Sequence, residues 1–250
     1  MKIGRSPRPV RIGLRDVDKE SAGSDQGGVD TPCDAAVVVL LCGLPASGKT
    51  TIAARLAAGL DAVLIRSCDV YQRLGISLPG WVIATRGMTQ NVEGYERLRD
   101  RAYEEMAREL RAALADGARA VVVDAVHGER DKRAAVFALC QRYRAVPVLV
   151  WCRCDDLAET DRRLAARCGR EAEPEHEASD MAVYRHIVSL WNDPLADDAM
   201  VDVAVCDTKR GITWWERRRD APQVELVARV LREVGEDVVS RGGTEPPTPD

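Results

Sequence analysis

The sequence predicts an α/β protein of three layers, in which helices cover both faces of a five-stranded, mostly parallel sheet. Three observations predict it. Short apolar runs rich in β-branched residues alternate with helix-like stretches between residues 35 and 238. The runs are continuously apolar, as in strands that are buried on both faces. A glycine-rich segment joins the first run to the first helix, so a ligand site is expected at that point.

The strand and helix pattern extends over most of the chain. Five apolar runs are expected to be strands: 35–42, 62–65, 120–123, 146–151 and 201–205. Helices are expected at about 50–57, 92–116, 130–143, 156–167, 179–190 and 222–234, with a possible short one at 71–74. Because the carboxyl ends of parallel strands share one edge of a sheet, residues that follow different strands should converge there.

The two ends of the chain differ from the middle in composition. Residues 1–34 are rich in Arg, Asp, Gly, Ser and Pro without periodicity, and residues 239–250 are rich in Gly, Pro and Thr. Both are expected to be disordered tails, which leaves one domain at 35–238. The basic N-terminus lacks an apolar core of the kind that a signal peptide needs.

Composition excludes several classes of protein. The net charge of −4 gives no global footprint for nucleic acid or for an anionic membrane. The longest apolar run is strand-sized, so no membrane span is expected. The eight cysteines form no C-x-x-C pair, and buried free thiols in a cytoplasmic protein are therefore expected.

The glycine-rich segment contains the pattern G-x-x-x-x-G-K-[ST] between a strand and a helix, which is the context of a phosphate-binding P-loop. Its members, which we expect to bind the phosphates of a nucleotide, are Gly43, Leu44, Pro45, Ala46, Ser47, Gly48, Lys49, Thr50 and Thr51. The glycines let backbone N–H groups point at an anion. Lys49 is one of only five lysines, beside thirty-one arginines, and its compact ammonium suits the outer phosphates. Thr50 is expected to bind Mg²⁺ through its hydroxyl.

Two carboxylates follow strands beside this loop. Asp69 comes just after the second strand, where it could be a general base for an attacking hydroxyl or hold Mg²⁺ through water. The alternative is a helix N-cap. Asp124 ends the third strand, as a Walker B aspartate does, and is expected to help hold Mg²⁺.

Arginines supply further candidates. Arg162, Arg163 and Arg167 lie on the helix after the fourth strand, and Arg163 and Arg167, spaced four apart, share a helix face that could clamp a phosphoryl group. A solvated basic face is the alternative. The stretch at about 167–180 is expected to be a lid that excludes water. Arg73 and Arg130 are weaker candidates for substrate contacts.

Three aromatic positions leave two interpretations open. His127 follows Asp124 by three residues and either faces the crevice or is structural, which is the commoner role. Trp81 and the pair Trp214–Trp215 either stack on a base or a sugar, or pack in a core or an interface.

The segment from Leu41 to Thr50, followed by Ser67-Cys68-Asp69, Val123-Asp124 and an arginine-bearing helix, resembles the adenylate-kinase-like P-loop kinases. It is most similar to the AAA-labelled ATP-dependent kinases related to zeta toxins, gluconate kinase and polynucleotide kinase, and its loop also resembles that of seryl-tRNA(Sec) kinase. The resemblance covers about residues 35–210. It implies a P-loop NTPase fold with ATP and Mg²⁺ at Lys49 and Thr50, a general base at Asp69, and lid arginines at Arg163 or Arg167.

One position departs from that resemblance. The family often has an arginine three residues after the second-strand aspartate, where this chain has Gln72, and Arg73 follows. A domain of the kind that binds tRNA is also not apparent after the last strand. These features favour transfer of the γ-phosphoryl group of ATP to the hydroxyl of a small molecule. The alternatives are an RNA or polynucleotide kinase and an ATP-binding switch without kinase activity.

Overall fold

The protein is described by a computed structural model over residues 35–75, 92–168, 181–197 and 201–242. In chain order the elements are β1 (Val37–Cys42), α1 (Lys49–Leu60), β2 (Val63–Arg66), α2 (Ser67–Arg73), α4 (Val92–Ala115), β3 (Ala120–Asp124), α5 (Arg130–Arg142), β4 (Val146–Arg153), α6 (Leu157–Cys168), α7 (Met181–Ser189), β5 (Asp202–Asp207), β6 (Ile212–Arg217) and α8 (Pro222–Gly242). A 3-10 turn, Pro194–Ala196, lies between α7 and β5. The predicted α/β class is confirmed.

The sheet has six strands in the order β2-β3-β1-β4-β5-β6. The first five are parallel, as predicted, and β6 pairs antiparallel with β5. The predicted count of five strands is therefore wrong by one. The missed strand contains Trp214 and Trp215, which belong to an edge strand, and Trp215 packs against the core.

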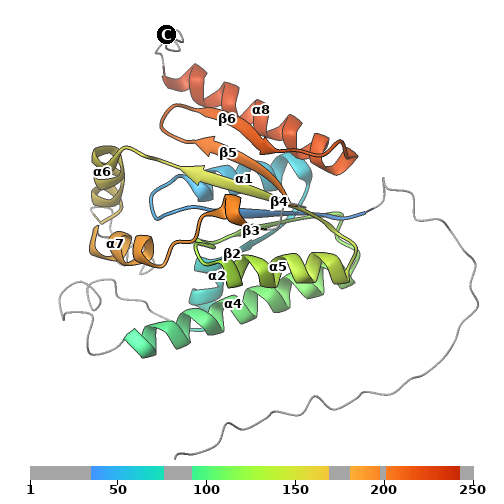
Figure 1. Cartoon of the computed structure of the whole chain (residues 1–250), viewed down its shortest axis with the longest axis horizontal. Coiled ribbons are helices and arrows are strands. Elements are labelled where there is room, and N and C mark those ends of the chain that lie inside the picture. The colour runs from blue at the N-terminus through green and yellow to red at the C-terminus, as the bar shows by residue number, and fades with distance from the viewer. Residues whose placement is uncertain (1–34, 76–91, 169–180, 198–200, 243–250) are drawn as a thin grey trace, which may run out of the picture. The chain divides into compact units, whose positions relative to one another are not determined.

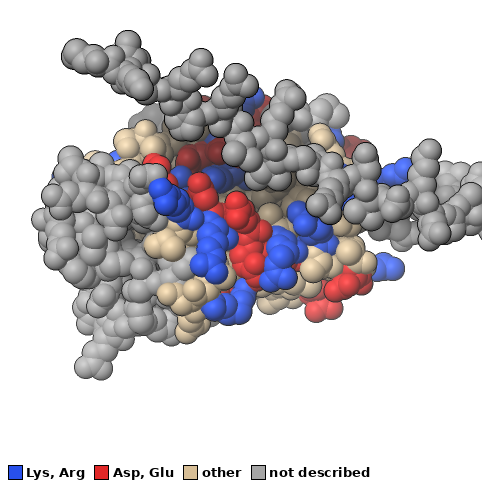
Figure 2. Space-filling view, turned by 90° about the horizontal axis from the view of Figure 1, so that it is seen from below, with Lys and Arg blue, Asp and Glu red and all other residues tan. Residues whose placement is uncertain are grey.

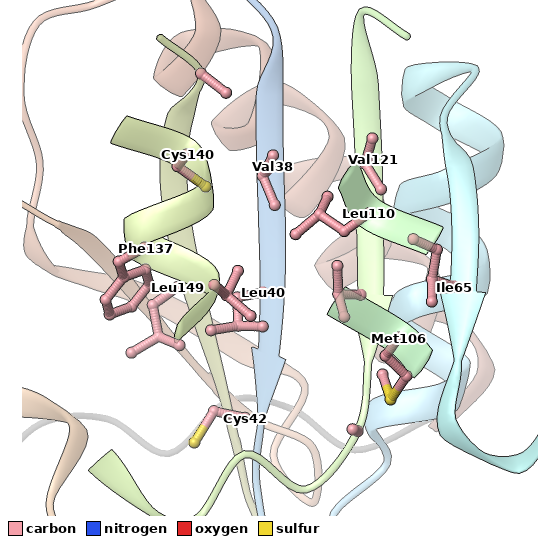
Figure 3. Close-up of a cluster of buried hydrophobic side chains, with 14 of the residues drawn as sticks. Val38, Leu40, Cys42, Ile65, Met106, Leu110, Val121, Phe137, Cys140 and Leu149 are labelled. Atoms are coloured by element: carbon pink, nitrogen blue, oxygen red, sulfur yellow. The ribbon is translucent and has the colours of Figure 1, made fainter. Parts of the chain in front are cut away.

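Helices cover both faces of this sheet (Figure 1). Helices α1 and α8 pack together on one face, and α4 and α5 lie on the other. Strand β1 is buried on both faces: Val38, Leu40 and Cys42 point into the cluster under α4 and α5, and Val37, Val39 and Leu41 into the cluster under α1 and α8. Figure 3 shows the first of these clusters, with Met106 and Leu110 of α4 and Phe137 and Cys140 of α5 over the strands. The continuous apolar runs in the sequence follow from this burial on two sides.

Helix boundaries agree with the expected ones within a few residues, except at two places. Helix α2 begins at Ser67, before the short helix expected at 71–74, and the other difference lies at the end of the chain. Helix α8 runs to Gly242, beyond the expected end near Val234, and so includes the first residues of the segment predicted to be a tail. Expectations for residues 1–34, Trp81, 169–180 and 243–250 lie outside the described residues. Within the described part of the chain, no helix is long and apolar enough to cross a membrane. The six cysteines whose side chains are described are free thiols.

Candidate active site

The loop between β1 and α1 is built as an anion cradle. Three of its residues have left-handed backbone conformations: Gly43 (φ 156°), Ala46 (φ 62°) and Gly48 (φ 84°). A Cβ atom on Gly43 would lie 2.4 Å from the carbonyl oxygen of Cys152, and one on Gly48 would lie 3.0 Å from Cγ2 of Thr208. Gly43 therefore requires glycine for space as well as for conformation, whereas a side chain at Gly48 would be strained by the backbone conformation and would crowd Thr208. Successive N–H groups in such a backbone can point at one anion.

Two side chains of this loop fit a phosphate ligand. The hydroxyl of Ser47 is buried and makes no hydrogen bond within the described residues. A buried polar atom of this kind usually has a partner, so a ligand oxygen is a fitting one. The ammonium of Lys49 donates to the carbonyl oxygen of Leu44 at 2.8 Å, which holds it over its own loop. The loop therefore fits the phosphates of a nucleotide.

Asp124 lies in space beside the end of β1, where the P-loop begins. It is the last residue of β3 and pairs in register with Leu41 of β1 and with Arg66 of β2. Its side chain is buried. Within the described residues, no three His, Cys, Asp or Glu side chains gather into a metal cluster. Magnesium in nucleotide sites commonly takes only one or two carboxylates, with phosphate and water as its other ligands, and Asp124 with Thr50 fits that pattern.

Asp69 lies at the same edge of the sheet, in the first turn of α2. The helix begins after Arg66, so Asp69 is not its N-cap. Oδ1 of Asp69 lies 3.5 Å from Nη1 of Arg66, and the side chain is 42% exposed. A half-exposed carboxylate at this edge is accessible to a substrate, which is a requirement for a general base.

Arg163 is close to the P-loop, but its guanidinium already has protein partners. Nη1 donates to the carbonyl oxygen of Ala46 at 3.2 Å and to the hydroxyl of Thr208 at 2.9 Å, and Nε donates to Glu159 at 2.7 Å. Hydrogen bonds from Arg162 and from Arg163 lower the pKa of Glu159 to about 2. In this arrangement Arg163 joins α6 to the P-loop and to the turn after β5. The side chain of Arg167 lies outside the described residues.

The two candidate substrate arginines lie farther from the loop. Arg73, at the end of α2, makes an ion pair with Glu109 of α4. Arg130, at the start of α5, has Nε 3.7 Å from a carboxylate oxygen of Asp197, and its side chain is 67% exposed. Both positions leave room for other partners.

A cavity of about 440 Å³ lies beside the P-loop. It is bounded by the P-loop and α1, by α6, by the turn between β5 and β6, and by α8. Residues from each of these elements line it: Gly48, Thr51, Arg162, Thr208, Thr213 and Val234. A pocket of this size, next to an anion cradle, has the volume of a small ligand.

Helices α6 and α7 contact the loop through a small apolar cluster. Ala46 of the loop, Leu164 of α6 and Tyr184 of α7 are its buried members, with Leu44 and Met181 packed against them. Figure 1 shows α6 and α7 together at one end of the sheet. The segment expected to carry a lid is therefore flanked by two helices that pack on the P-loop.

His127 has a structural position. It is buried with a left-handed backbone (φ 42°), and its Nδ1 is 2.9 Å from the carbonyl oxygen of Leu41. Since a carbonyl oxygen only accepts, Nδ1 carries the proton. Burial lowers the pKa of His127 to about 4, although hydrogen bonds to Leu41 and Ala125 oppose the shift and the charge of Arg133 reinforces it. The imidazole is therefore neutral near pH 7.

This shift predicts a pH dependence of stability. The folded-state pKa of about 4 lies below the ordinary histidine pKa of 6.5, so the unfolded chain binds the additional proton first as the pH falls. Stability is complete above pH 6.5 and declines toward pH 4. Between pH 7 and pH 5 we expect a loss of about 2 kcal/mol in the free energy of unfolding from this group, measured by urea denaturation.

A variant can assign that loss to His127. In His127→Asn, whose new side chain tolerates a left-handed backbone, the difference between pH 7 and pH 5 should shrink by most of this amount. His186→Asn, at a second buried histidine, should retain it. An unchanged pH dependence in His127→Asn would show that the lowered pKa is assigned to the wrong group.

Sequence reasoning missed Arg133 of α5, a fully buried arginine with five hydrogen bonds. It belongs to no motif, and its partners come from two separate segments, the loop after β3 and the segment after α7. The only available signal was a basic residue at an inward-facing helix position.

The parallel sheet, the glycine-rich loop and the aspartate at the end of β3 together define a protein of the P-loop NTPase fold. Comparison with protein families shows a match to the family AAA_33, described as an AAA domain, over residues 38–186. The chain belongs to this family. The predicted resemblance to the AAA-labelled P-loop kinases is thereby confirmed.

Solved structures share this fold at low sequence identity. A protein from Chloroflexus aurantiacus, provisionally assigned as a kinase, is 16% identical with a TM-score of 0.50, over 83% of this chain and 98% of its own. Kti12 from Chaetomium thermophilum, solved with ADP-AlF3, is 16% identical with a TM-score of 0.50, over 80% of this chain and 98% of its own. Shikimate kinase from Acinetobacter baumannii is 14% identical with a TM-score of 0.43, over 84% and 97%. Comparison with curated proteins found no match.

Proposed function

We propose that this protein is a cytoplasmic kinase that transfers the γ-phosphoryl group of Mg-ATP to a hydroxyl of a small molecule. The observation that carries the proposal is the common position of a P-loop and two aspartates, Asp69 and Asp124, at one edge of the sheet. A phosphate cradle alone also suits a nucleotide switch. A half-exposed carboxylate beside it supports a reaction with a second substrate.

ATP would be held by two parts of the site. The backbone N–H groups of the P-loop, the hydroxyl of Ser47 and the ammonium of Lys49 would bind its phosphates. The 440 Å³ cavity beside the loop has room for a nucleoside. The complex of Kti12 with ADP-AlF3 supports a nucleotide in this fold. Thr50 and Asp124 would hold Mg²⁺, which would neutralise phosphate charge during transfer.

The protein's own side chains would supply position and proton transfer. Lys49 would exchange the carbonyl oxygen of Leu44 for phosphate oxygens. Asp69 would take the proton of the acceptor hydroxyl. The hydroxyl oxygen would attack the γ-phosphorus while the bond from this phosphorus to ADP breaks. Arg163 would keep the loop and the turn after β5 together, and Arg167 would be the arginine closer to the lid. Arg73 and Arg130 are proposed to contact the acceptor, and residues 35–238 to form the catalytic domain.

The charge distribution supports a small-molecule acceptor over RNA. The cluster Arg217–Arg219 is a local group of basic residues that could bind RNA, but Arg219 is paired with Asp202 and Arg218 with Glu225. On the face formed by α4 and α5, Figure 2 shows positive and negative side chains intermixed. Pairs such as Lys132 with Asp100 account for this pattern. A polyanion is better bound by unpaired cations on one face.

The proposal can be tested with γ-labelled ATP. The purified protein is incubated with Mg²⁺ and with either a pool of hydroxyl-bearing metabolites or a pool of RNA, and the labelled product is identified. We expect label on a small molecule, and no transfer by Lys49→Ala. Label on RNA alone would favour the polynucleotide kinase. Tight ATP binding without transfer to either pool would favour the switch protein.

A further inference from the structure

Arg133 is a buried charge whose donors are all used. Its side chain is fully buried in α5, and Asp197, its counter-ion, is 4% exposed. Burying an ionised group is costly unless charge and hydrogen bonds compensate it. A guanidinium has five N–H donors in a fixed fork, and Arg133 makes five hydrogen bonds.

These five hydrogen bonds reach two segments that are far from each other in the sequence. Nη1 donates to the carbonyl oxygens of His127 at 2.8 Å and Gly128 at 2.9 Å, in the loop after β3. Nη2 donates to the carbonyl oxygen of Asn192 at 3.1 Å and to Asp197 at 3.0 Å, and Nε donates to the other oxygen of Asp197. One side chain therefore ties the loop after β3 to the segment that follows α7.

The loop after β3 is in turn bonded to the start of the P-loop. The N–H of Gly43 donates to the carbonyl oxygen of Val126 at 3.0 Å. The thiol of Cys42 donates to the carbonyl oxygen of His127 at 3.3 Å, and Nδ1 of His127 donates to Leu41 at 2.9 Å. The same loop begins directly after Asp124. A shift of this loop would therefore move both the first P-loop residue and the proposed magnesium ligand.

The segment after α7 holds the loop from its other side. The N–H of Asn192 donates to the carbonyl oxygen of Gly128 at 2.9 Å, and the N–H of Arg130 donates to Oδ1 of Asn192 at 3.0 Å. Trp191 lies against Gly128, where a Cβ atom would be 2.9 Å from the indole. The loop thus lies between β1 and the segment 191–197, and Arg133 joins the loop to that segment.

We propose that Arg133 is a positioning residue for phosphoryl transfer, which holds the loop 125–129 so that Gly43 and Asp124 keep their places at the phosphates. The inference rests on the proposed function. A lysine at this position would keep the charge, but its three donors cannot replace a five-donor fork. A lysine would also leave buried carbonyl oxygens without a donor and so lower the stability. The positioning role is therefore measured by kcat and by amide exchange in the folded protein.

The experiment compares Arg133→Lys with Arg219→Lys. The control changes another arginine that is paired to a buried aspartate, Asp202, away from the P-loop. Both variants are assayed well below their own melting temperatures, so that only folded protein is compared. We expect kcat to fall about 10- to 100-fold in Arg133→Lys, the Kd for ATP to change less than about threefold, and Arg219→Lys to match the parent protein.

Amide hydrogen exchange supplies a readout that does not need activity. In the nucleotide-free protein, the N–H of Gly43 donates to the carbonyl oxygen of Val126, and the N–H of His127 donates to the hydroxyl of Tyr103. We expect both to exchange about 10-fold faster in Arg133→Lys, with β5 unchanged. Should Arg133→Lys not fold, Asp197→Asn, which keeps an acceptor and removes the counter-charge, is measured in its place.

The outcomes separate the two proposals. A lowered melting temperature with unchanged kcat and unchanged exchange at Gly43 and His127 would overturn the positioning role. If the parent protein transfers no phosphoryl group, the proposed function fails. The exchange rates of those two amides then still decide whether Arg133 positions the loop.

Discussion

Replacing Lys49 by alanine should lower kcat for phosphoryl transfer by about 10³-fold or more. The ammonium lies on the P-loop, 2.8 Å from the carbonyl oxygen of Leu44, and is the cation of this loop that can move to the outer phosphates. In the Lys49→Ala variant, the negative charge on the γ-phosphoryl group would lose its nearest positive side chain during transfer. The measurement is kcat with the acceptor identified in the γ-labelled ATP screen.

Two companion variants make this result specific. Lys49→Arg keeps a positive charge but replaces a compact ammonium by a planar fork, and should recover little activity. Lys132→Ala removes a lysine of α5 that is paired with Asp100 and should retain kcat. Full activity in Lys49→Ala would rule out this loop as the site of phosphoryl transfer.

Asp69→Asn should lower kcat by about 10²- to 10⁴-fold, while the Kd for ATP stays within about threefold of the parent value. The change keeps the size of the side chain and removes the oxygen that accepts the proton. Asp69 stands in the first turn of α2 and not in the P-loop, so nucleotide binding should be retained. Steady-state kinetics and calorimetric titration with ATP measure the two quantities.

The matched control is Asp131→Asn. Asp131 also lies in the first turn of a helix, α5, and its side chain is 73% exposed. The same loss of charge at a helix N-terminus should leave kcat unchanged there. If Asp69→Asn retains the parent kcat with the identified acceptor, Asp69 is not the general base.

The central strand and the P-loop could be predicted because their signals are local. An apolar strand followed by two glycines, a lysine and a threonine at set spacing describes a backbone shape and its ligand within one short, continuous segment. The parallel direction of the first five strands could be predicted because their continuous apolar runs are separated by helices. The resemblance to the AAA-labelled kinases depended on the same short segments.

Strand β6 was missed for a physical reason. It is an edge strand in which exposed residues alternate with partly buried ones, so its pattern differs from the buried strands. Its tryptophans suggested a stacking or packing role instead of a strand. Only its pairing with β5 identifies it.

The tertiary structure determined which arginines of an arginine-rich chain have a particular role. The four-residue spacing of Arg163 and Arg167 predicts a shared helix face, but the bonds from Arg163 to Ala46 and Thr208 depend on segments more than forty residues away. No sequence motif indicates the role of Arg133, because its five acceptors meet only when α5, the loop after β3 and the segment after α7 are packed together. A short continuous segment determines phosphate recognition, because backbone conformation and one helix N-terminus are enough to produce it. The roles of long charged side chains cannot be predicted in this way, because contacts across the whole fold determine their partners.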